Sequence, residues 1–281
     1  MHNASTFAGK KYRDRNHIAS AYDRFAEQEE YRSKKGMHRI EAGLIEYLLQ
    51  KYLSDKKTII DIGAGPGIYA SWLANRGSTV ELVDVSERCL KLAAYRAEQS
   101  SLENKMSFRV GDAAELYFEE DESFDGALCL GPIYHAADVE DTQDMLREAY
   151  RILRPDGFYI LNCANPFPWI KVVAASGEFK VAEESLDEIA QRGYCVLDGN
   201  GSEFGSFLCT SDAMKTFLIE TGFYVINHFG SKGVFQNCDL STINKFDQDA
   251  LRQAQQLLIK TSTIFEYITQ SEFLFFVAKK V

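Results

Sequence analysis

An aspartate and three glycines follow a predicted buried strand and could together hold a ligand. Asp61 comes near the end of an apolar run, and Gly63, Gly65 and Gly67 follow at alternate positions, with Ala64 inside the turn. Glycines permit backbone angles that other residues avoid, and they let a ligand approach the main-chain N–H groups before the next helix. Many nucleotide-binding folds share such a turn. The pattern therefore predicts a bound ligand but no specific chemistry.

Acidic residues follow the next two predicted strands. Asp84, with Val85 after it, lies about 20 residues past the first glycine, where an acidic residue binds ribose hydroxyls in dinucleotide sites. Asp112 follows the third strand between Gly111 and Ala113 and offers a carboxylate to an adenine amino group. The carboxyl ends of parallel strands form the edge at which ligands bind. The three strand ends together predict an adenosine-containing cofactor.

The charge at the first turn favours one class of cofactor. Asp61 would repel the pyrophosphate of a dinucleotide and attract the ammonium of S-adenosylmethionine (SAM). The last glycine of the dinucleotide fingerprint is also missing, because Ile68 occupies its position. The alternative is that Asp61 only caps the following turn. Both departures from the fingerprint predict SAM rather than NAD.

From Lys57 to Asn165 the chain resembles the class I SAM-dependent methyltransferases. The family's first motif resembles residues 61–67, its ribose-binding acid falls on Asp84, and its adenine-side acid falls on Asp112. The resemblance implies SAM as cofactor and S-adenosylhomocysteine (SAH) as product. The implied cofactor-binding residues are Asp61, Gly63, Ala64, Gly65, Gly67, Asp84, Val85, Gly111, Asp112, Ala113, Leu130, Gly131 and Tyr22.

Alternating strand and helix patterns predict an α/β fold with a doubly wound parallel sheet. The family resemblance implies seven strands, of which the last, within 272–279, is antiparallel. Two helices, 16–28 and 36–53, precede the first strand, so residues 1–56 are interpreted as an N-terminal helical lid. Residues 57–281 form the expected SAM-binding core. Cap insertions are predicted at about 165–209 and 231–270, where the strand–helix rhythm is interrupted.

The loop after the fourth strand, residues 130–135, is the main indication of the substrate. Its sequence, Leu-Gly-Pro-Ile-Tyr-His, resembles that of a group of bacterial methyltransferases with unassigned or small-molecule substrates. In the family this position faces the departing methyl group. Gly131 stands where DNA adenine methyltransferases carry an Asp or Asn, so nucleobase methylation is disfavoured. His135 is the candidate general base because histidine titrates near neutral pH; Tyr134 is the candidate for orienting the substrate. Both could instead serve only to cap or pack the loop.

Aromatic residues of the leading helices could cover the cofactor. Tyr12, Tyr22 and Tyr31, together with Arg24, fall within or next to them. An aromatic face near a sulfonium gains cation–π stabilisation. Tyr22 is therefore included among the cofactor-binding residues, although aromatic residues at helical spacing are also common in cores.

Composition and charge exclude several classes of function. The 281 residues include 31 basic and 41 acidic side chains, a net charge of −10, which opposes binding to a phosphate backbone. The six cysteines show no Cys-x-x-Cys spacing and no clustering with histidine, which predicts reduced thiols, no metal site and a cytoplasmic protein. No apolar run reaches the ~18 residues that span a membrane, and no signal-peptide core is present at the N-terminus.

These observations predict a methyltransferase that uses SAM to methylate a nitrogen, oxygen or carbon atom of a small molecule. One alternative is a methyltransferase for a protein or a tRNA, which would need an open basic surface. Others are a non-catalytic SAM-binding protein and a dehydrogenase with the same fold. The acceptor and the oligomeric state, monomer or homodimer, stay open.

Overall fold

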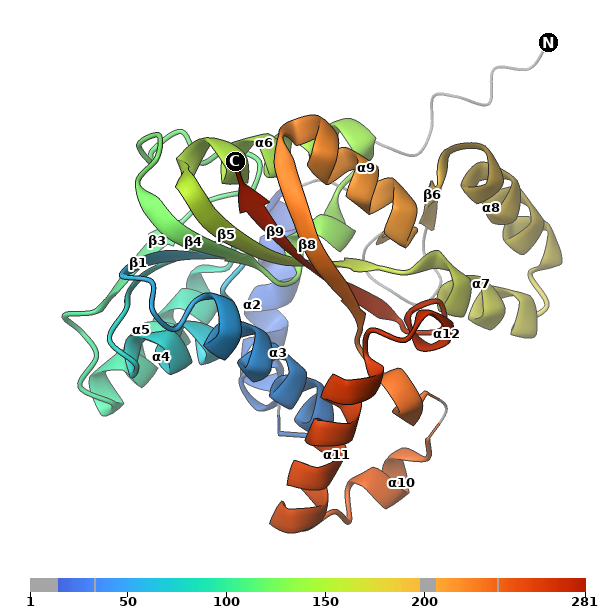
Figure 1. The fold of residues 1–281 in the computed structure, drawn as a ribbon, viewed down its shortest axis with the longest axis horizontal. Helices are drawn as coiled ribbons and strands as arrows, with labels where there is room; N and C mark the ends of the chain where they lie inside the picture. The colour runs from blue at the N-terminus through green and yellow to red at the C-terminus, as the bar shows by residue number, and fades with distance from the viewer. Residues whose placement is uncertain (1–14, 33, 198–205, 237) are drawn as a thin grey trace.

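The computed structural model describes residues 15–32, 34–197, 206–236 and 238–281. Within these residues one sheet runs through the molecule (Figure 1). Its seven main strands have the order β3-β2-β1-β4-β5-β9-β8. They are β1 (Thr58–Ile62), β2 (Thr79–Asp84), β3 (Met106–Val110), β4 (Phe124–Cys129), β5 (Leu153–Ala164), β8 (Phe223–Gly230) and β9 (Phe273–Lys280). Among these seven strands, β9 alone runs opposite to the common direction, so the predicted α/β fold is confirmed.

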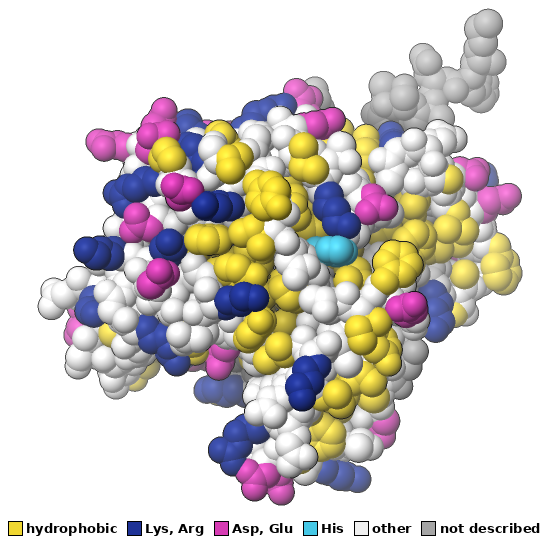
Figure 2. Space-filling model, in the orientation of Figure 1, with side chains coloured by type: hydrophobic (Ala, Val, Ile, Leu, Met, Phe, Trp, Pro, Cys, Tyr) yellow, Lys and Arg dark blue, Asp and Glu magenta, His cyan; other side chains and the backbone are white. Residues whose placement is uncertain are grey.

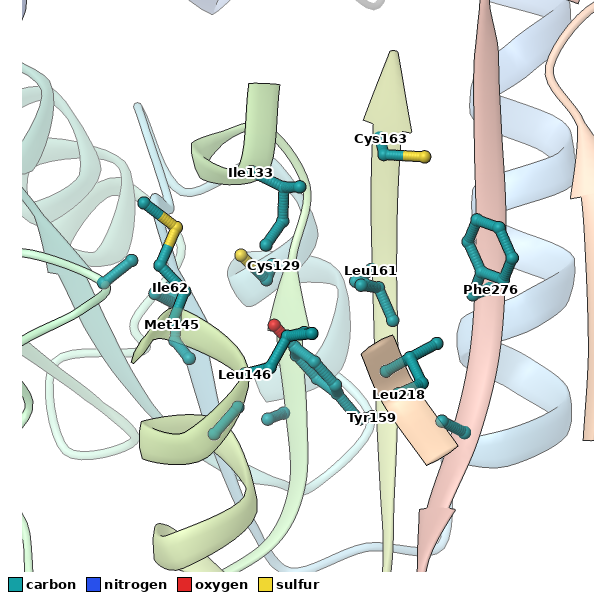
Figure 3. Close-up of a cluster of buried hydrophobic side chains, with 14 of the residues drawn as sticks. Ile62, Cys129, Ile133, Met145, Leu146, Tyr159, Leu161, Cys163, Leu218 and Phe276 are labelled. Carbon is teal, nitrogen blue, oxygen red and sulfur yellow. The ribbon is translucent and has the colours of Figure 1, made fainter. Parts of the chain in front are cut away.

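Helices cover both faces of the sheet and bury its apolar side chains. One face packs against α3 (His38–Tyr52), α4 (Ile68–Ala74) and α5 (Glu87–Gln99). The other face packs against α6 (Val139–Ile152) and α9 (Ser211–Thr221). Figure 3 shows this second core, in which Leu146 and Leu218 lie beside the strand residues Tyr159 and Leu161. Burial on both faces explains the continuous apolar runs of the central strands.

Several helices begin where a short polar side chain can accept a backbone N–H. Ser86 caps α5, Asp138 caps α6 and Thr210 caps α9. Asp247 likewise caps α11 (Gln248–Thr261). Such caps satisfy donors that lack a partner inside the helix, and each of these four helices begins directly after its capping residue.

The fifth strand begins earlier than the sequence predicts. The residue types of Pro155–Asp156–Gly157 predict a turn, with a strand only from 157, but β5 starts at Leu153 directly after α6. Asp156 has φ +66°, and the pairing of β5 with β4 shifts register at Phe124. The turn residues are thus an irregularity inside a strand. The carboxylate of Asp156 also forms an ion pair with Lys279 at 2.6 Å, which ties the irregular segment to β9.

The two predicted insertions contain helices and a hairpin. In the first, α7 (Pro166–Ala175) and α8 (Phe179–Arg192) precede β6 (Tyr194–Leu197), which pairs with β7 (Ser206–Cys209); β7 joins the end of β5 through one residue pair, Ala164 with Leu208. The second contains η2 (Gly233–Phe235), α10 (Leu240–Ile243), α11 and α12 (Phe265–Ile268). Their role as caps stays a prediction.

The helix α11 of the second insertion lies beside α3 (Figure 1). The side-chain amide of Gln255 donates to the carbonyl oxygen of Arg39 at 2.9 Å, and Arg39 donates to the carbonyl oxygen of Phe246 at 3.1 Å. A Cβ on Gly43 would overlap the side chain of Gln255. Close approach of the two helices therefore requires glycine at this position of α3.

Basic and acidic side chains are intermingled on the face shown in Figure 2. Hydrophobic side chains also gather there, and α7 and α8 expose several large ones, including Val172 and Phe179. Among the described residues, no helix combines the length and apolarity needed to cross a bilayer.

Candidate active site

The turn after β1 contains three glycines with left-handed backbone angles. φ is +72° at Gly63, +54° at Gly65 and +71° at Gly67, a region that other residues rarely adopt. The amide of Gly63 donates to the carbonyl oxygen of Val83 at 2.7 Å, which joins the turn to β2. A Cβ on Gly63 would lie 2.4 Å from Cγ of Pro132, whereas a Cβ on Gly65 would meet no atom within 4 Å. Open space therefore lies directly beside Gly65.

Two buried carboxylates flank this turn. Oδ2 of Asp84 accepts the Gly65 amide and Oδ1 accepts the Ser86 amide, both at 2.8 Å. Burial, reinforced by the charge of Asp84, raises the pKa of Asp61 to about 7; burial also raises the pKa of Asp84 to about 6. No lysine or arginine of the described chain forms an ion pair with either group. Both can therefore bind a cation or a hydrogen-bond donor from a ligand.

The end of β3 brings a third carboxylate to the same edge. Asp112 accepts the amide of Ala114 at 2.8 Å through Oδ1, and Nε of Arg15 lies 2.9 Å from its Oδ2. Arg15 is the first residue of α2 (Arg15–Arg32) and also pairs with Glu115. A ligand that reaches Asp112 would therefore share the carboxylate with the start of α2.

The loop after β4 places an aromatic and imidazole group beside these carboxylates. Tyr134 and His135 belong to the short helix η1 (Pro132–His135), and their rings are 4.7 Å apart. Nε2 of His135 lies 2.7 Å from the hydroxyl oxygen of Tyr22 on α2. Burial, assisted by the positive charge of Arg32, lowers the pKa of His135 to about 4. The imidazole is therefore neutral near pH 7.

One side of α2 forms a wall of the site. Ile18, Tyr22, Glu29 and Arg32 all line it and recur at spacings of four, seven and three residues, which places them on one helix face. Nη1 of Arg32 lies 3.1 Å from Oε2 of Glu29. The same helix is anchored to α5 and the loop before it: Asp23, Glu27 and Glu30 contact Ser86, Arg88 and Arg96, respectively.

These groups line a cavity with two lobes. The Asp84 lobe, about 740 Å³ with its open mouth, contains Asp84, Asp112, Tyr134 and His135. The Asn162 lobe, about 710 Å³ with its open mouth, contains Asp61, Glu41 and Asn162. Both lobes are lined by Glu29, Arg32, Gly63, Gly65 and Leu130. The shared residues make the glycine turn and the end of β4 the junction of the two lobes.

The sequence around this cavity matches a known family. Residues 59–157 match the family described as a methyltransferase domain. These residues form a class I SAM-dependent methyltransferase domain. The match begins in β1, includes the glycine turn and the three strand ends, and stops inside β5. The predicted family resemblance is thereby confirmed.

Curated relatives share this methyltransferase region. "Methyltransferase GfsG" of Streptomyces halstedii is 36% identical over 100 residues, which are 35% of this chain and 34% of the relative. A "Ubiquinone biosynthesis O-methyltransferase" of Pseudomonas entomophila (strain L48) is 28% identical over 143 residues, 51% of this chain and 60% of the relative. The chain thus spans between about a third and three fifths of the length of these relatives.

Solved structures of methyltransferases share the fold over more of the chain. A 1,6-didemethyltoxoflavin-N1-methyltransferase of Burkholderia thailandensis, solved with S-adenosylhomocysteine, has a TM-score of 0.60, 16% identity and coverage of 95% of this chain and 87% of its own. A SAM-dependent methyltransferase of Methanosarcina mazei has a TM-score of 0.58, 18% identity and coverage of 83% and 97%. At these identities the likeness concerns the fold alone.

The cavity has the hydrogen-bond acceptors that the donors of SAM require. SAM brings an ammonium, ribose hydroxyls and an adenine, and no phosphate. The cavity offers the buried carboxylates of Asp61 and Asp84, the partly buried carboxylate of Asp112, and open space beside Gly65. SAM is the cofactor of this family. The contacts of individual residues with it stay predictions.

Of the residues predicted to bind SAM, only Gly67 lies away from the cavity lining. Gly67 is the N-cap residue of α4, and a Cβ there would lie 2.9 Å from the side chains of Leu82 and Ala93. Its role is therefore close packing of α4. Both catalytic candidates, Tyr134 and His135, line the Asp84 lobe.

Other cavity residues were not predicted from the sequence. Among the leading residues, Tyr31 is exposed, Arg24 bonds to Ser20, and Tyr12 lies outside the described residues. Glu29 and Arg32 of the same helix line the cavity instead. Their spacing from Tyr22 on one helix face was the sequence signal that could have identified them. Asn162 and Glu41 had no such signal, because a polar residue within an apolar strand or helix has no distinctive spacing.

Asp84→Ala is expected to raise the dissociation constant for SAM at least tenfold, a loss of about 1.4 kcal/mol. The substitution removes the expected acceptor for ribose hydroxyls, and it leaves the amides of Gly65 and Ser86 without their carboxylate partner. Isothermal titration calorimetry measures the change. The exposed Asp187→Ala on α8 is the matched control. An unchanged constant in Asp84→Ala would remove this residue from the cofactor site.

Asp61→Asn is expected to stabilise the ligand-free protein while weakening SAM binding. The folded-state pKa of Asp61, about 7, exceeds its ordinary value of 3.8. Its favourable contribution to the free energy of unfolding is therefore complete below pH 4 and is lost as pH rises through 7. The amide side chain of Asn avoids this loss, so we expect the variant's free energy of unfolding to be about 1–3 kcal/mol higher at pH 8. Denaturant unfolding at pH 5 and pH 8 tests the difference.

The exposed Asp55→Asn is the control for this experiment and is expected to show no such pH-dependent gain. SAM affinity of the unaltered protein is expected to fall as pH decreases below 7, because protonation of Asp61 removes the charge that attracts the ammonium. Equal stability of Asp61→Asn and the unaltered protein at pH 8, with equal SAM affinity, would contradict both expectations.

Proposed function

We propose that the protein transfers a methyl group from SAM to a nitrogen, oxygen or carbon atom of a small molecule. The observation that carries this proposal is the two-lobed cavity, which is lined both by residues of the predicted cofactor site and by the Tyr134–His135 pair. A cavity beneath α2 suits a small acceptor. A protein or tRNA acceptor would need an open basic surface, and the net charge of −10 opposes a tRNA.

The printed names of similar proteins support a small acceptor without fixing the atom that is methylated. They include an O-methyltransferase of ubiquinone biosynthesis, an N1-methyltransferase bound to 1,6-didemethyltoxoflavin, and a geranyl diphosphate C-methyltransferase. All three act on small molecules. The proposal therefore includes nitrogen, oxygen and carbon as acceptor atoms.

SAM supplies a methyl group activated on a sulfonium. The protein's residues align the acceptor and exclude water. Asp61 and Arg32 offer opposite charges for the ammonium and carboxylate of the methionine part, while Asp84 offers acceptors for the ribose hydroxyls. The anchoring of α2 to α5 holds Tyr22 and Arg32 against the cavity. An acceptor beneath α2 is thereby separated from bulk solvent.

His135 is the group that accepts a proton when the acceptor requires deprotonation. Its low pKa keeps the imidazole neutral above about pH 4, which is the form that acts as a base. Because Nε2 lies 2.7 Å from the Tyr22 hydroxyl oxygen, proton transfer to Nε2 passes through that hydroxyl or follows its displacement. The alternative role of His135 is to fix the loop through the same hydrogen bond.

A turnover assay tests the proposed function. The protein is incubated with methyl-labelled SAM and a metabolite extract, and SAH formation and the labelled fraction are measured together. We expect SAH to form and label to enter a small molecule. Label in protein or tRNA would favour the macromolecular alternative. SAM binding without SAH formation in any fraction would favour a non-catalytic SAM-binding protein.

We also expect a cytoplasmic location, as the cysteine pattern predicts.

A further inference from the structure

The Asn162 lobe extends beyond the strands that carry the cofactor motif. Asp61, Gly63 and Asp84 stand at the ends of β1 and β2, whereas Asn162 is on β5. Leu161 pairs with Cys129, which pairs with Ile62, so Asn162 lies level with the glycine turn but two strands away. Adjacent strands are about 4.8 Å apart, which places Asn162 about 10 Å from the turn. This lobe therefore has room for a second molecule.

Asn162 presents a polar group that the protein itself does not satisfy. The residue is only 5% exposed, and Oδ1 has no hydrogen-bond partner among the described residues. A buried polar atom without a partner costs about 1–3 kcal/mol, and such atoms are rare in folded proteins. Because Asn162 lines the lobe, a ligand in the lobe can supply the missing hydrogen-bond donor.

The charged groups around this lobe favour a cationic ligand. Glu41 on α3 is 8% exposed, and its Oε2 lies 2.9 Å from Nδ1 of His38. Glu29, Glu41 and Asp61 contribute three carboxylates against the single guanidinium of Arg32. SAM, with a sulfonium, an ammonium and a carboxylate, carries a net charge of +1. When Asp61 is ionised, above about pH 7, one negative charge of the lobe is therefore left for a second cation to neutralise.

Apolar side chains complete the lobe and suit the body of such a ligand. Ile45 comes from α3, Tyr69 from α4 and Phe275 from β9, where Phe275 pairs directly with Asn162 across the strands. Small-molecule sites commonly combine apolar walls with a few polar groups that set orientation. A ligand with one amine on a small apolar or aromatic body matches this lining.

We propose that Asn162 and Glu41 bind the methyl acceptor and that the acceptor is a small amine. The inference rests on the proposed methyltransferase function and narrows its substrate class. The bound ammonium first transfers its proton to water at the open mouth of the cavity. The nitrogen lone pair then forms the new N–C bond while the C–S bond breaks and its electron pair stays on sulfur. The products are a methylated ammonium and the neutral thioether SAH.

Binding of matched probes to the SAH-saturated protein tests this inference. Benzylamine, benzyl alcohol and benzoate share a ring and differ in the polar group. By calorimetry, the dissociation constant for benzylamine is expected to be at least about tenfold below those of the other two, a difference of about 1.4 kcal/mol. Asn162→Leu and Glu41→Gln are each expected to weaken benzylamine binding about fivefold or more while changing SAH affinity less than about twofold.

Exposed positions provide the controls. Asn104→Leu and Glu98→Gln repeat the same chemical changes away from the cavity and are expected to leave the dissociation constants for the probes and for SAH unchanged.

Equal binding of the three probes, preference for benzoate, or no binding of benzylamine would overturn the amine assignment and leave the methyltransferase proposal intact. So would a loss of SAH affinity in Asn162→Leu equal to its loss of benzylamine affinity, because Asn162 would then belong to the cofactor site.

Failure of the underlying function has a separate signature. A protein that binds neither SAM nor SAH would overturn the proposed function and, with it, this inference. If Glu41→Gln does not fold because its bond to His38 is altered, the ranking of the three probes on the unaltered protein and the Asn162→Leu result decide the matter.

Discussion

Gly65→Ala is expected to weaken SAM binding at least about 100-fold, a loss of about 2.7 kcal/mol. The added methyl group would occupy the open space beside the glycine turn, where no protein atom lies within 4 Å, and this is the space assigned to the cofactor. The substitution also imposes about 1–2 kcal/mol of backbone strain, because φ at Gly65 is +54°. Calorimetric titration with SAM measures the affinity and thermal unfolding measures the strain.

Gly177→Ala separates these two effects. Gly177, between α7 and α8, has φ +89°, and a Cβ there also meets no atom within 4 Å. We expect it to lose stability as Gly65→Ala does but to keep its SAM affinity. Similar SAM affinities of the two variants would contradict the assignment of the space beside Gly65 to the cofactor.

His135→Ala is expected to lower turnover at least about 100-fold, within the usual contribution of a general base, while SAM affinity changes less than about twofold. The imidazole lies beside Tyr22 and Tyr134 in the Asp84 lobe and is neutral above about pH 4. Because the base is already deprotonated, titration of His135 should not reduce turnover between pH 8 and pH 5.5. Steady-state kinetics across this range with the identified acceptor provide the measurement.

Two further variants distinguish the base from a loop-capping residue. His135→Gln keeps a hydrogen-bonding side chain but cannot accept a proton at this pH, so turnover should stay low if His135 is the base. Recovery of turnover in His135→Gln would identify a capping role. His228→Gln, on β8 and outside both lobes, is the matched control and should retain full turnover.

The cofactor half of the site could be predicted because its residues belong to continuous strand–turn segments. Asp61 and Gly63 stand together in one segment, and Asp84 is identified by its distance from them along the chain. The parallel sheet then brings their strand ends to one edge. Sequence spacing alone therefore placed these carboxylates beside the glycine turn.

The rest of the cavity depends on packing between distant segments. Glu29 and Arg32 reach the cavity only because α2 is anchored to α5, and Asn162 enters it only through the position of β5 beside β4. The early start of β5 has a similar origin, since Leu153 pairs with Phe124 of β4 and the ion pair between Asp156 and Lys279 ties the following segment to β9. Such pairings and packing contacts leave no local pattern in the sequence.

Parallel calorimetric titrations with SAM and with NADH test the central claim most directly. The lining around Asp61 and Asp84 is acidic and would repel the pyrophosphate of NADH. We therefore expect SAM to bind with one site per chain and NADH to give no measurable heat of binding. Tight binding of NADH together with no binding of SAM would contradict the account.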